Sequence, residues 1–380
     1  MVIVEPTELV FSVPDPDRRL RGVRLWDGLD LPAVPREFRM DGDAPGGDPA
    51  GHAEPVAPQP TWTLRLPRPA INRLEYQVEL THPDGGSEFT VDPTNPQTTP
   101  GVFGPKSVLE LPGYTPPVWL GTDPWPLADE FRVETGIGPV DLAVRSPTAA
   151  TSRVVFAHDG PEYDVLASLG SYAAFAAAPG DPVPSDPGPG DPPDASGTGS
   201  PAVPPFHLVL AAPGARDDRY SASPSYTRAL AEKVLPQMHE RLGSGGPVVL
   251  IGASLGGLAG LALQRRYPEA VAGLFLQSGS FFTPQLDGVE SRFGHFGRIT
   301  RAVARVQADL PPGRPVPTVL TCGAAEENLR NNQLMARVLR RQGYPVTLHE
   351  VPDGHNYVAW RDALHPHLTG LLAQVWTAPG

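Results

Sequence analysis

The stretch PVVLIGASLGGLAGLAL occupies residues 247–263 and decides the fold. It begins with a short apolar run, passes through a turn in which Ser254 lies between Gly252 and Gly256, and continues as an apolar helical pattern. This G-x-S-x-G arrangement is typical of a sharp strand-to-helix turn that holds a serine in a strained conformation with its hydroxyl exposed. The N-terminus of the following helix offers backbone N–H groups to developing negative charge. We therefore predict that Ser254 is a nucleophile.

A serine nucleophile needs a base to accept its proton, and a histidine near the end of the chain is the candidate. His355 follows the strand-like run at 346–350 and lies on a glycine-containing loop. Chains with this kind of turn place the residues in the order serine, acid, histidine, and His355 fits that order. The neighbouring His365 and His367 fall on the next helical pattern, where we expect solvent-facing or capping roles.

The acid that holds the histidine should follow the preceding strand. The run at 317–321 is followed by CGAAEE, which ends in Glu326 and Glu327. We select Glu326 and keep Glu327 as the alternative. Asp353 is less suited, because it lies only two residues before the base.

Hydrolysis of an acyl group also needs two donors for the developing oxyanion. The backbone N–H of Leu255, directly after the nucleophile, is the first. The second should come from the loop at 157–161. Pro161 has no N–H, so either Gly160 or Glu162 has to donate.

Strand and helix patterns alternate after about residue 125. A helix over 224–242 begins at Ser223-Pro224, and Pro236 should kink it. The later apolar runs are continuous, as in strands that are covered on both faces. We predict a mostly parallel, doubly wound sheet of the α/β class. Its expected strands are 140–144, 153–157, 207–211, 247–251, 273–277, 317–321 and 346–350.

The first third of the chain has a different pattern, with apolar residues at alternate positions. This holds at 62–66 and 74–80, and more weakly at 20–26, with Glu75, Gln77 and Glu79 on the expected wet face of one strand. A small antiparallel sandwich over 1–122 is predicted, followed by a catalytic domain over 123–380. Residues 41–60 are expected to be a mobile loop, and the Pro/Gly-rich segment 179–205 a disordered insertion.

Composition excludes several classes of function. The formal net charge of −12 argues against a nucleic-acid or anionic-membrane partner. The single cysteine, Cys322, excludes an internal disulfide framework and a Cys-rich zinc site. The predicted chemistry requires no metal and no organic cofactor. The first residues lack a basic segment followed by an apolar one, so we expect a cytoplasmic protein; its oligomeric state, including a homodimer, is left open.

Several segments of the chain resemble a known family. GASLGGLAGLALQRRYPEAVAGLFLQSGSFF, CGAAEENLRNNQLMARVLRRQGYPVTLHEV and DGHNYVAWRDAL are similar to the putative esterase family that includes enterochelin esterases. The segment EYQVELTHPDGGSEFTVDPTNPQTTPGVFGPKSVLELPGY resembles the immunoglobulin-like early-set domain that precedes the hydrolase there. The resemblance implies a lidless α/β-hydrolase with Ser254 as nucleophile, His355 as base and Glu326 as acid. It also implies a small-molecule ester substrate, with the ester of a ferric siderophore as one candidate.

One segment departs from the family. The siderophore hydrolases carry an arginine followed by a carboxylate after the strand at 207–211, whereas this chain has Arg216-Asp-Asp-Arg219-Tyr220. Arg216 and Arg219 are candidates for a positive substrate pocket, and the alternative is a solvated loop. A ferric tricatecholate is a trianion, so this region bears directly on siderophore specificity.

Two other functions compete with ester hydrolysis. One is acyl transfer of the mycolyltransferase type, which would use the same site with a different acceptor. The other is carbohydrate binding by the N-terminal sandwich, either alone or in a carbohydrate ester hydrolase. Exposed aromatic residues on one strand would favour it, but Trp62 and Tyr76 lie on apolar stripes and are expected in the core.

Overall fold

The computed structural model describes residues 2–31, 34–41, 59–102, 104–178, 203–308 and 313–377. These residues form two compact units. The smaller unit comprises Met1–Tyr114 with Ala324–Glu326 and Pro352–Gly354, and the larger comprises Thr115–Gly323, Glu327–Val351 and His355–Gly380. The first boundary between the two units thus falls after Tyr114, whereas the sequence analysis placed it after residue 122. The expected loop at 41–60 and insertion at 179–205 lie almost entirely outside the described residues.

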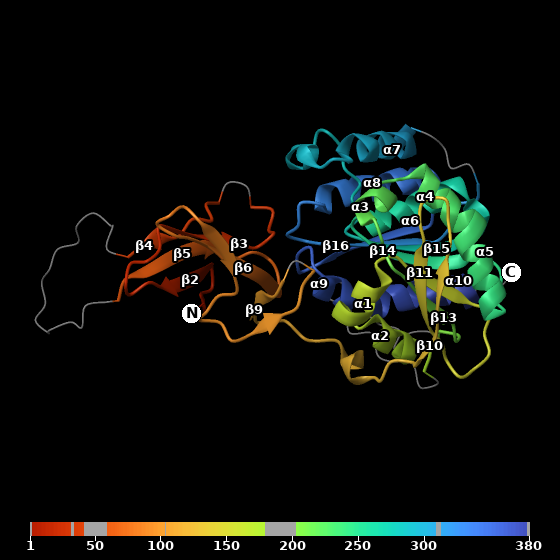
Figure 1. Ribbon diagram of the computed structural model, residues 1–380, viewed down its shortest axis with the longest axis horizontal. Helices are drawn as coiled ribbons and strands as arrows, with labels where there is room; N and C mark the ends of the chain where they lie inside the picture. The colour runs from red at the N-terminus through yellow and green to blue at the C-terminus, as the bar shows by residue number, and fades with distance from the viewer. Residues whose placement is uncertain are drawn as a thin grey trace, which may run out of the picture. The chain divides into compact units, whose positions relative to one another are not determined.

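The larger unit is built on an eight-stranded sheet with the order β10-β11-β13-β12-β14-β15-β16-β17 (Figure 1). All neighbours from β13 to β17 are parallel, while β10 and β11 add an antiparallel edge. The mostly parallel α/β sheet predicted from the sequence is therefore confirmed, with β10 as the strand that was missed. The strands are β10 (Leu127–Val133), β11 (Val140–Arg145), β12 (Val154–Ala157), β13 (His207–Ala211), β14 (Val248–Ala253), β15 (Val271–Gln277), β16 (Thr318–Gly323) and β17 (Val346–Val351).

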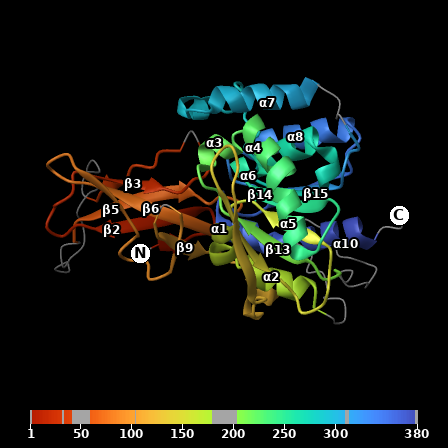
Figure 2. The same cartoon turned by 45° about the vertical axis from the view of Figure 1, so that its right-hand side comes forward.

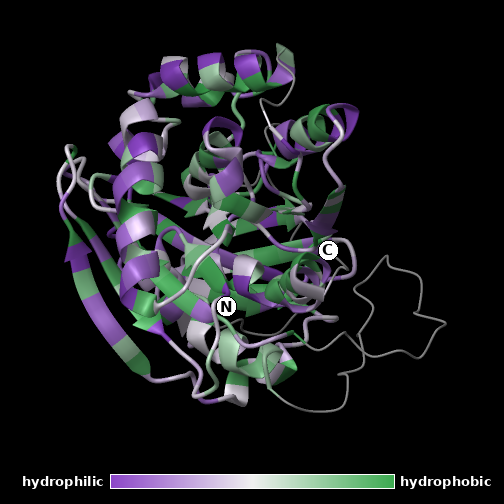
Figure 3. Ribbon diagram, turned by 90° about the vertical axis from the view of Figure 1, so that its right-hand side faces the viewer, coloured by the Kyte–Doolittle hydropathy of each residue, from purple (hydrophilic) through white to green (hydrophobic). Residues whose placement is uncertain are grey.

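Helices cover both faces of this sheet (Figures 1 and 2). One face carries α1 (Gly160–Leu166), α2 (Leu169–Ala176), α9 (Tyr357–Asp362) and α10 (Thr369–Thr377). The other carries α3 (Arg216–Tyr220), α4 (Pro224–Ala229), α5 (Leu235–Leu242), α6 (Leu255–Arg266), α7 (Phe296–Ala308) and α8 (Leu329–Arg341). Each helical layer packs against the sheet through its own apolar core, and the strands between them are the most hydrophobic part of the unit (Figure 3).

The helical segment at 224–242 shows how proline is accommodated. Ser223 caps it by accepting a hydrogen bond from the backbone N–H of Tyr226, as predicted. A kink was expected at Pro236; a π-helical segment, Leu230–Val234, ends two residues before this proline, and α5 continues from Leu235. A wider π turn leaves room for a proline ring, which donates no backbone N–H to the preceding turn.

Strand burial follows position in the sheet. All six residues of the central strand β14 are buried, whereas the edge strand β17 has none in the buried class. The continuous apolar pattern therefore marks the interior strands, and the edge strand is only partly covered.

The smaller unit consists of two antiparallel sheets. One has the order β1-β2-β5-β4 and the other β3-β6-β9-β8, with β7 paired to β6. Leu9 and Leu66 from the first sheet share a core with Leu25 and Tyr76 from the second, so the predicted sandwich is confirmed. The strands are β1 (Val2–Val4), β2 (Glu8–Pro14), β3 (Gly22–Trp26), β4 (Arg39–Met40), β5 (Thr61–Pro67), β6 (Arg73–Thr81), β7 (Ser87–Thr90), β8 (Thr98–Thr99) and β9 (Lys106–Glu110).

Glu75 does not lie on a wet face of β6, as the alternation had suggested. It is 8% exposed, and its carboxylate pairs with Arg73 at 2.8 Å and with Lys106 at 3.6 Å. Two cationic partners offset the loss of hydration, which a binary apolar/polar pattern does not express.

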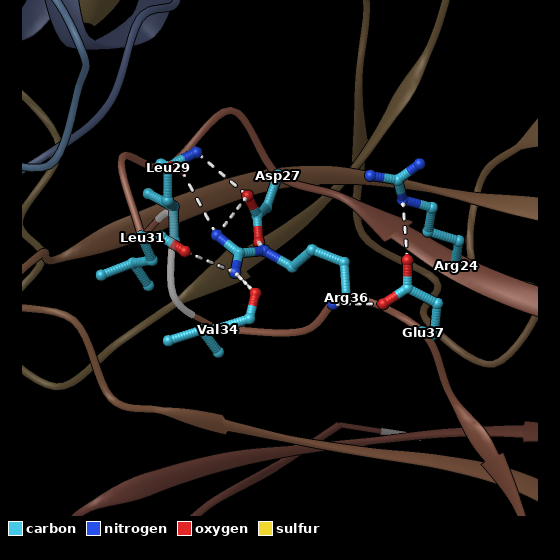
Figure 4. Close-up of polar contacts among 7 residues, drawn as sticks. All are labelled: Arg24, Asp27, Leu29, Leu31, Val34, Arg36 and Glu37. Atoms are coloured by element: carbon cyan, nitrogen blue, oxygen red, sulfur yellow. Dashed lines mark hydrogen bonds and ion pairs between the residues drawn. The ribbon is translucent and has the colours of Figure 1, made fainter.

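A partly buried arginine binds the segment after β3. Arg36 donates to the carboxylate of Asp27 at 2.6 Å and to the carbonyl oxygens of Leu29, Leu31 and Val34 (Figure 4). A planar guanidinium has enough donors to satisfy several acceptors at once. Arg36 therefore links the described residues on both sides of this segment.

Candidate active site

Ser254 lies at the turn between β14 and α6, where the sequence analysis placed it. Its backbone has φ 54° and ψ −122°, a conformation that non-glycine residues rarely adopt. A Cβ atom on Gly252 would lie 2.5 Å from the carbonyl group of Gly256, so only glycine fits where the chain doubles back. Ser254 is half-buried and stands as the N-cap residue of a twelve-residue helix. The turn thus presents a hydroxyl beside the positive end of a helix.

The loop after β12 packs directly behind this turn. The Nδ1 atom of His158 lies 3.1 Å from the carbonyl oxygen of Gly256, so this nitrogen carries the proton. Burial lowers the pKa of His158 to about 4, and the ring is therefore neutral at pH 7. Asp159 is 1% exposed and receives two 2.8 Å hydrogen bonds from the guanidinium of Arg216. The elbow is therefore supported by a neutral imidazole and a bidentate ion pair.

Arg219 is also engaged within the fold. It is 7% exposed, and its guanidinium donates to the carbonyl oxygens of Pro213 (3.3 Å), Ile137 (3.4 Å) and Pro139 (2.9 Å). Arg216 has a one-third exposed side chain and lies over the ring of Tyr220. Neither arginine lies on a solvated loop, and the substrate-binding role predicted for both stays a prediction.

The two predicted oxyanion donors lie in neighbouring loops. Leu255 begins α6, and the first N–H groups of a helix have no partner within it. Gly160 begins α1 after β12, which is the parallel neighbour of β14, with Ala157 opposite Ile251. The intervening N–H of Asp159 is already donated to the hydroxyl of Tyr220 at 3.2 Å. The choice between Gly160 and Glu162 stays open.

His355 follows β17, at the same edge of the sheet as Ser254. Parallel strands end at a common edge, and β14 and β17 are separated in the sheet by β15 and β16. The ring of His355 meets the ring of Trp360 edge to face at 5.1 Å. Its Nδ1 atom lies 3.4 Å from the side-chain nitrogen of Asn328. The sequence analysis had assigned no role to either neighbour.

The candidate acids differ in burial. Glu326 follows β16 and is 2% exposed, Glu327 is exposed, and Asp353 is 6% exposed. Glu326 and Asp353 lie in the short segments Ala324–Glu326 and Pro352–Gly354, which are part of the smaller unit. The acid of the site stays a prediction.

His365 and His367, for which solvent-facing or capping roles were expected, are half-buried rather than fully exposed. His365 lies 3.1 Å from the hydroxyl of Thr369, and the ring of His367 stacks on His349 at 3.7 Å. Burial, and then the proximity of His349 and His365, lower the pKa of His367 to about 3. Both residues lie on the short helical segment Leu364–Leu368, directly before α10.

One neighbour of the nucleophile was missed altogether. The hydroxyl of Ser280, on the loop after β15, lies 3.1 Å from the hydroxyl of Ser254. The backbone N–H of Ser280 also donates to the carbonyl oxygen of Ser254 at 3.1 Å. The only signal in the sequence was a Ser-Gly-Ser run at the carboxyl end of a predicted strand.

Together, these features define an α/β-hydrolase with a serine nucleophile elbow. Residues 205–371, which include Ser254 and His355, match the model of the family described as putative esterase. This segment is similar to the putative esterase family, and the chain is a carboxylic ester hydrolase.

Solved structures with the same fold extend over nearly the whole chain. The enterobactin esterase FES from Shigella flexneri, crystallised in the presence of enterobactin, is 18% identical, with 99% of this chain and 94% of that chain covered at a TM-score of 0.67. The ferric enterobactin esterase from Salmonella typhimurium is 18% identical, with 98% and 96% covered at 0.68. At this identity the likeness shows the fold. No curated protein matches the sequence.

Neither a membrane-spanning helix nor a metal-binding cluster is found among the described residues. None of their helices combines the length and apolar character needed to cross a bilayer. No cluster of three or more His, Cys, Asp or Glu side chains among them is arranged to hold a metal ion.

Proposed function

We propose that the chain is a serine ester hydrolase that acts through Ser254, His355 and Glu326. The observation that carries this proposal is the strained backbone of Ser254 at the N-terminus of α6. Strain of this kind persists where the surrounding structure enforces it, and it exposes the hydroxyl for attack. The match to the putative esterase family includes this turn.

The proposed reaction proceeds through an acyl-enzyme. The oxygen of Ser254 attacks the ester carbonyl, and its proton passes to His355, which then gives it to the leaving alcohol. The N–H of Leu255, with that of Gly160 or Glu162, stabilises the negative charge on the carbonyl oxygen. Water then attacks the acyl carbon while giving a proton to His355; the bond to the oxygen of Ser254 breaks, that oxygen takes the proton back from His355, and the acid is released.

Burial supports Glu326 over Glu327 as the acid. A triad carboxylate has to orient the imidazole and stabilise its charged form, which is more effective away from water. Glu326 is 2% exposed, whereas Glu327 is exposed.

The proposed substrate class is a small ester, with siderophore trilactones as the candidate to test first. Two enterobactin esterases share the fold over nearly the full chain, including the N-terminal sandwich, which we propose is immunoglobulin-like. The arginines weigh against a trianionic ligand, because Arg216 is paired with Asp159 and Arg219 is bound by backbone carbonyls. A cytoplasmic location also stays a prediction.

The decisive experiment compares the wild type with Ser254→Ala. Hydrolysis of a short p-nitrophenyl ester should fall to the background rate, while the thermal unfolding curve is unchanged. More than a few per cent of residual rate would contradict the proposal. A panel of cyclic trilactones, feruloyl sugars and alkyl esters, with a sugar acceptor added and products identified by mass spectrometry, assigns the substrate and separates hydrolysis from acyl transfer.

A specific observation favours a second function, carbohydrate binding by the smaller unit. Tyr76 is fully buried and Trp62 packs against the core, as expected, but Trp26 and Phe89 are 48% and 53% exposed. Trp26 lies on β3 and Phe89 on β7, the two strands that pair with β6, and their ring centroids are 5.3 Å apart. The guanidinium of Arg24 lies over the ring of Trp26. Affinity electrophoresis of the full chain in polysaccharide gels should show retardation that Trp26→Ala abolishes. Equal mobility of the two proteins would exclude this role.

A further inference from the structure

We propose that Ser280 is a second catalytic hydroxyl, which donates a hydrogen bond to the oxygen of Ser254 and fixes its direction of attack. This inference rests on the proposed function of Ser254. The two hydroxyl oxygens are 3.1 Å apart, within hydrogen-bond distance. Ser280 is 1% exposed, so its hydroxyl has no access to bulk water and is held against the nucleophile.

The backbone brings Ser280 to this position independently of its side chain. The N–H of Ser280 donates to the carbonyl oxygen of Ser254, and the N–H of Ser254 donates to the carbonyl oxygen of Gln277 at 2.8 Å. The nucleophile is thus bound on both sides to the end of β15 and its loop. The distance between the hydroxyls is consequently set by main-chain hydrogen bonds.

A buried asparagine holds the loop in turn. The side-chain oxygen of Asn332 accepts from the N–H of Gly279 at 3.0 Å, and its nitrogen donates to the carbonyl oxygen of Gly279 at 2.9 Å. Asn332 is fully buried, and Asn328 donates to the carbonyl oxygen of Ser278 at 3.3 Å. Side chains from α8 therefore bind two successive residues before Ser280.

The loop has no space for a side chain at Gly279. A Cβ atom there would lie 2.4 Å from the ring of Phe281, which is 1% exposed. A site held this rigidly by a supporting layer of hydrogen bonds is what preorganised catalysis requires.

The direction of the hydrogen bond follows from the proposed reaction. A hydroxyl has one proton, so if Ser254 donated to Ser280, that proton would not be available to His355. In the productive state Ser280 therefore donates, and the hydrogen of Ser254 is directed to the base. During attack the proton of Ser254 moves to His355 and then to the leaving alcohol. Ser280 keeps its own proton throughout, and its hydrogen bond strengthens as negative charge grows on the oxygen of Ser254.

The test removes this hydroxyl and compares it with a neighbour in the same loop. Ser280→Ala should lower kcat for a p-nitrophenyl ester and the rate of labelling by a fluorophosphonate about tenfold, with KM within about twofold. The acid limb of the pH–rate profile, which reports the base, should stay in place. Ser278→Ala is the matched control, because the hydroxyl of Ser278 accepts from Trp360 at 3.0 Å. It should lower the melting temperature and leave kcat within about twofold.

The outcomes separate this inference from the proposed function. Unchanged kcat in Ser280→Ala, with hydrolysis abolished in Ser254→Ala, would overturn the role of Ser280 alone. Equal losses of kcat in Ser280→Ala and Ser278→Ala, in step with their melting temperatures, would also overturn it. Full activity of Ser254→Ala would overturn both. If Ser280→Ala does not fold, Ser280→Thr, which keeps the hydroxyl, should retain most of the labelling rate, and a loss as large as tenfold would refute the proposal.

Discussion

The ion pair behind the nucleophile elbow should be far more important for stability than an ordinary surface pair. Asp159 is 1% exposed and receives both of its 2.8 Å hydrogen bonds from Arg216. Arg216→Met would leave that carboxylate buried without its cation, a change that costs roughly 3–5 kcal/mol for a fully buried pair. Because the side chain of Arg216 is 33% exposed, water can replace part of the interaction. We expect a loss of about 2–3 kcal/mol.

The chain offers a matched control in Arg132 and Asp141. This pair has equally short contacts, at 2.6 and 3.0 Å, but its side chains are 59% and 51% exposed. Exposed pairs of this kind contribute little to stability, because water and salt screen them. Arg132→Met should therefore change the stability of the larger unit only slightly.

Scanning calorimetry measures the difference directly. For a unit of this size a loss of 1 kcal/mol lowers the melting temperature by roughly 2–4 °C. Arg216→Met should lower it by about 4–12 °C and Arg132→Met by no more than about 4 °C. Adding Asp159→Asn to Arg216→Met should recover part of the loss, because the uncompensated charge is gone. Equal shifts in melting temperature for the two arginine variants would show that the Arg216–Asp159 pair stabilises the unit no more than an exposed pair does.

Three further predictions concern pH, loop geometry and the acid. Burial lowers the pKa values of His158 and His367 to about 4 and 3 in the folded protein, so below about pH 6.5 the unfolded chain binds more protons than the folded one. The free energy of unfolding should therefore fall by about 2 kcal/mol per histidine between pH 7 and pH 5. Equal urea midpoints at the two pH values would contradict this. Gly279→Ala should destabilise the larger unit by roughly 1–3 kcal/mol and lower kcat, since its Cβ overlaps a buried ring; a wild-type melting temperature and kcat would count against it. Glu326→Gln should lower kcat more than Glu327→Gln in p-nitrophenyl ester assays, and the reverse order would reassign the acid.

The fold was largely predictable because its interior strands carry strong local signals. The runs that became β12 to β16 are short, apolar and bounded by turns, and their burial explains their composition. The strand β10 was missed because it lies at the sheet edge, where its exposed residues Glu130 and Arg132 hide the apolar pattern. Edge strands are paired on one side only, so little of their sequence is constrained by burial.

Of the candidate site, only the turn around Ser254 could be predicted, because its sequence motif lies within one short segment. Gly252, Ser254 and Gly256 lie within five residues, and the close approach that requires Gly252 is made within this segment. The contacts of Ser280 with Ser254 and of Asn332 with Gly279 join segments that are 26 and 53 residues apart. Such contacts depend on the order of strands in the sheet, which local patterns do not determine. The engagement of Arg219 by three carbonyls is of the same kind.

The central claim is that an acyl group is carried on the oxygen of Ser254 and that His355 makes this oxygen reactive. The most direct measurement is peptide mass spectrometry after brief reaction with p-nitrophenyl acetate and acid quenching, for the wild type and for His355→Ala. The account predicts an acetyl group on the peptide at Ser254 in the wild type and none in His355→Ala over the same interval. An acetyl group on a different residue, or equal acetylation of Ser254 in both proteins, would contradict it.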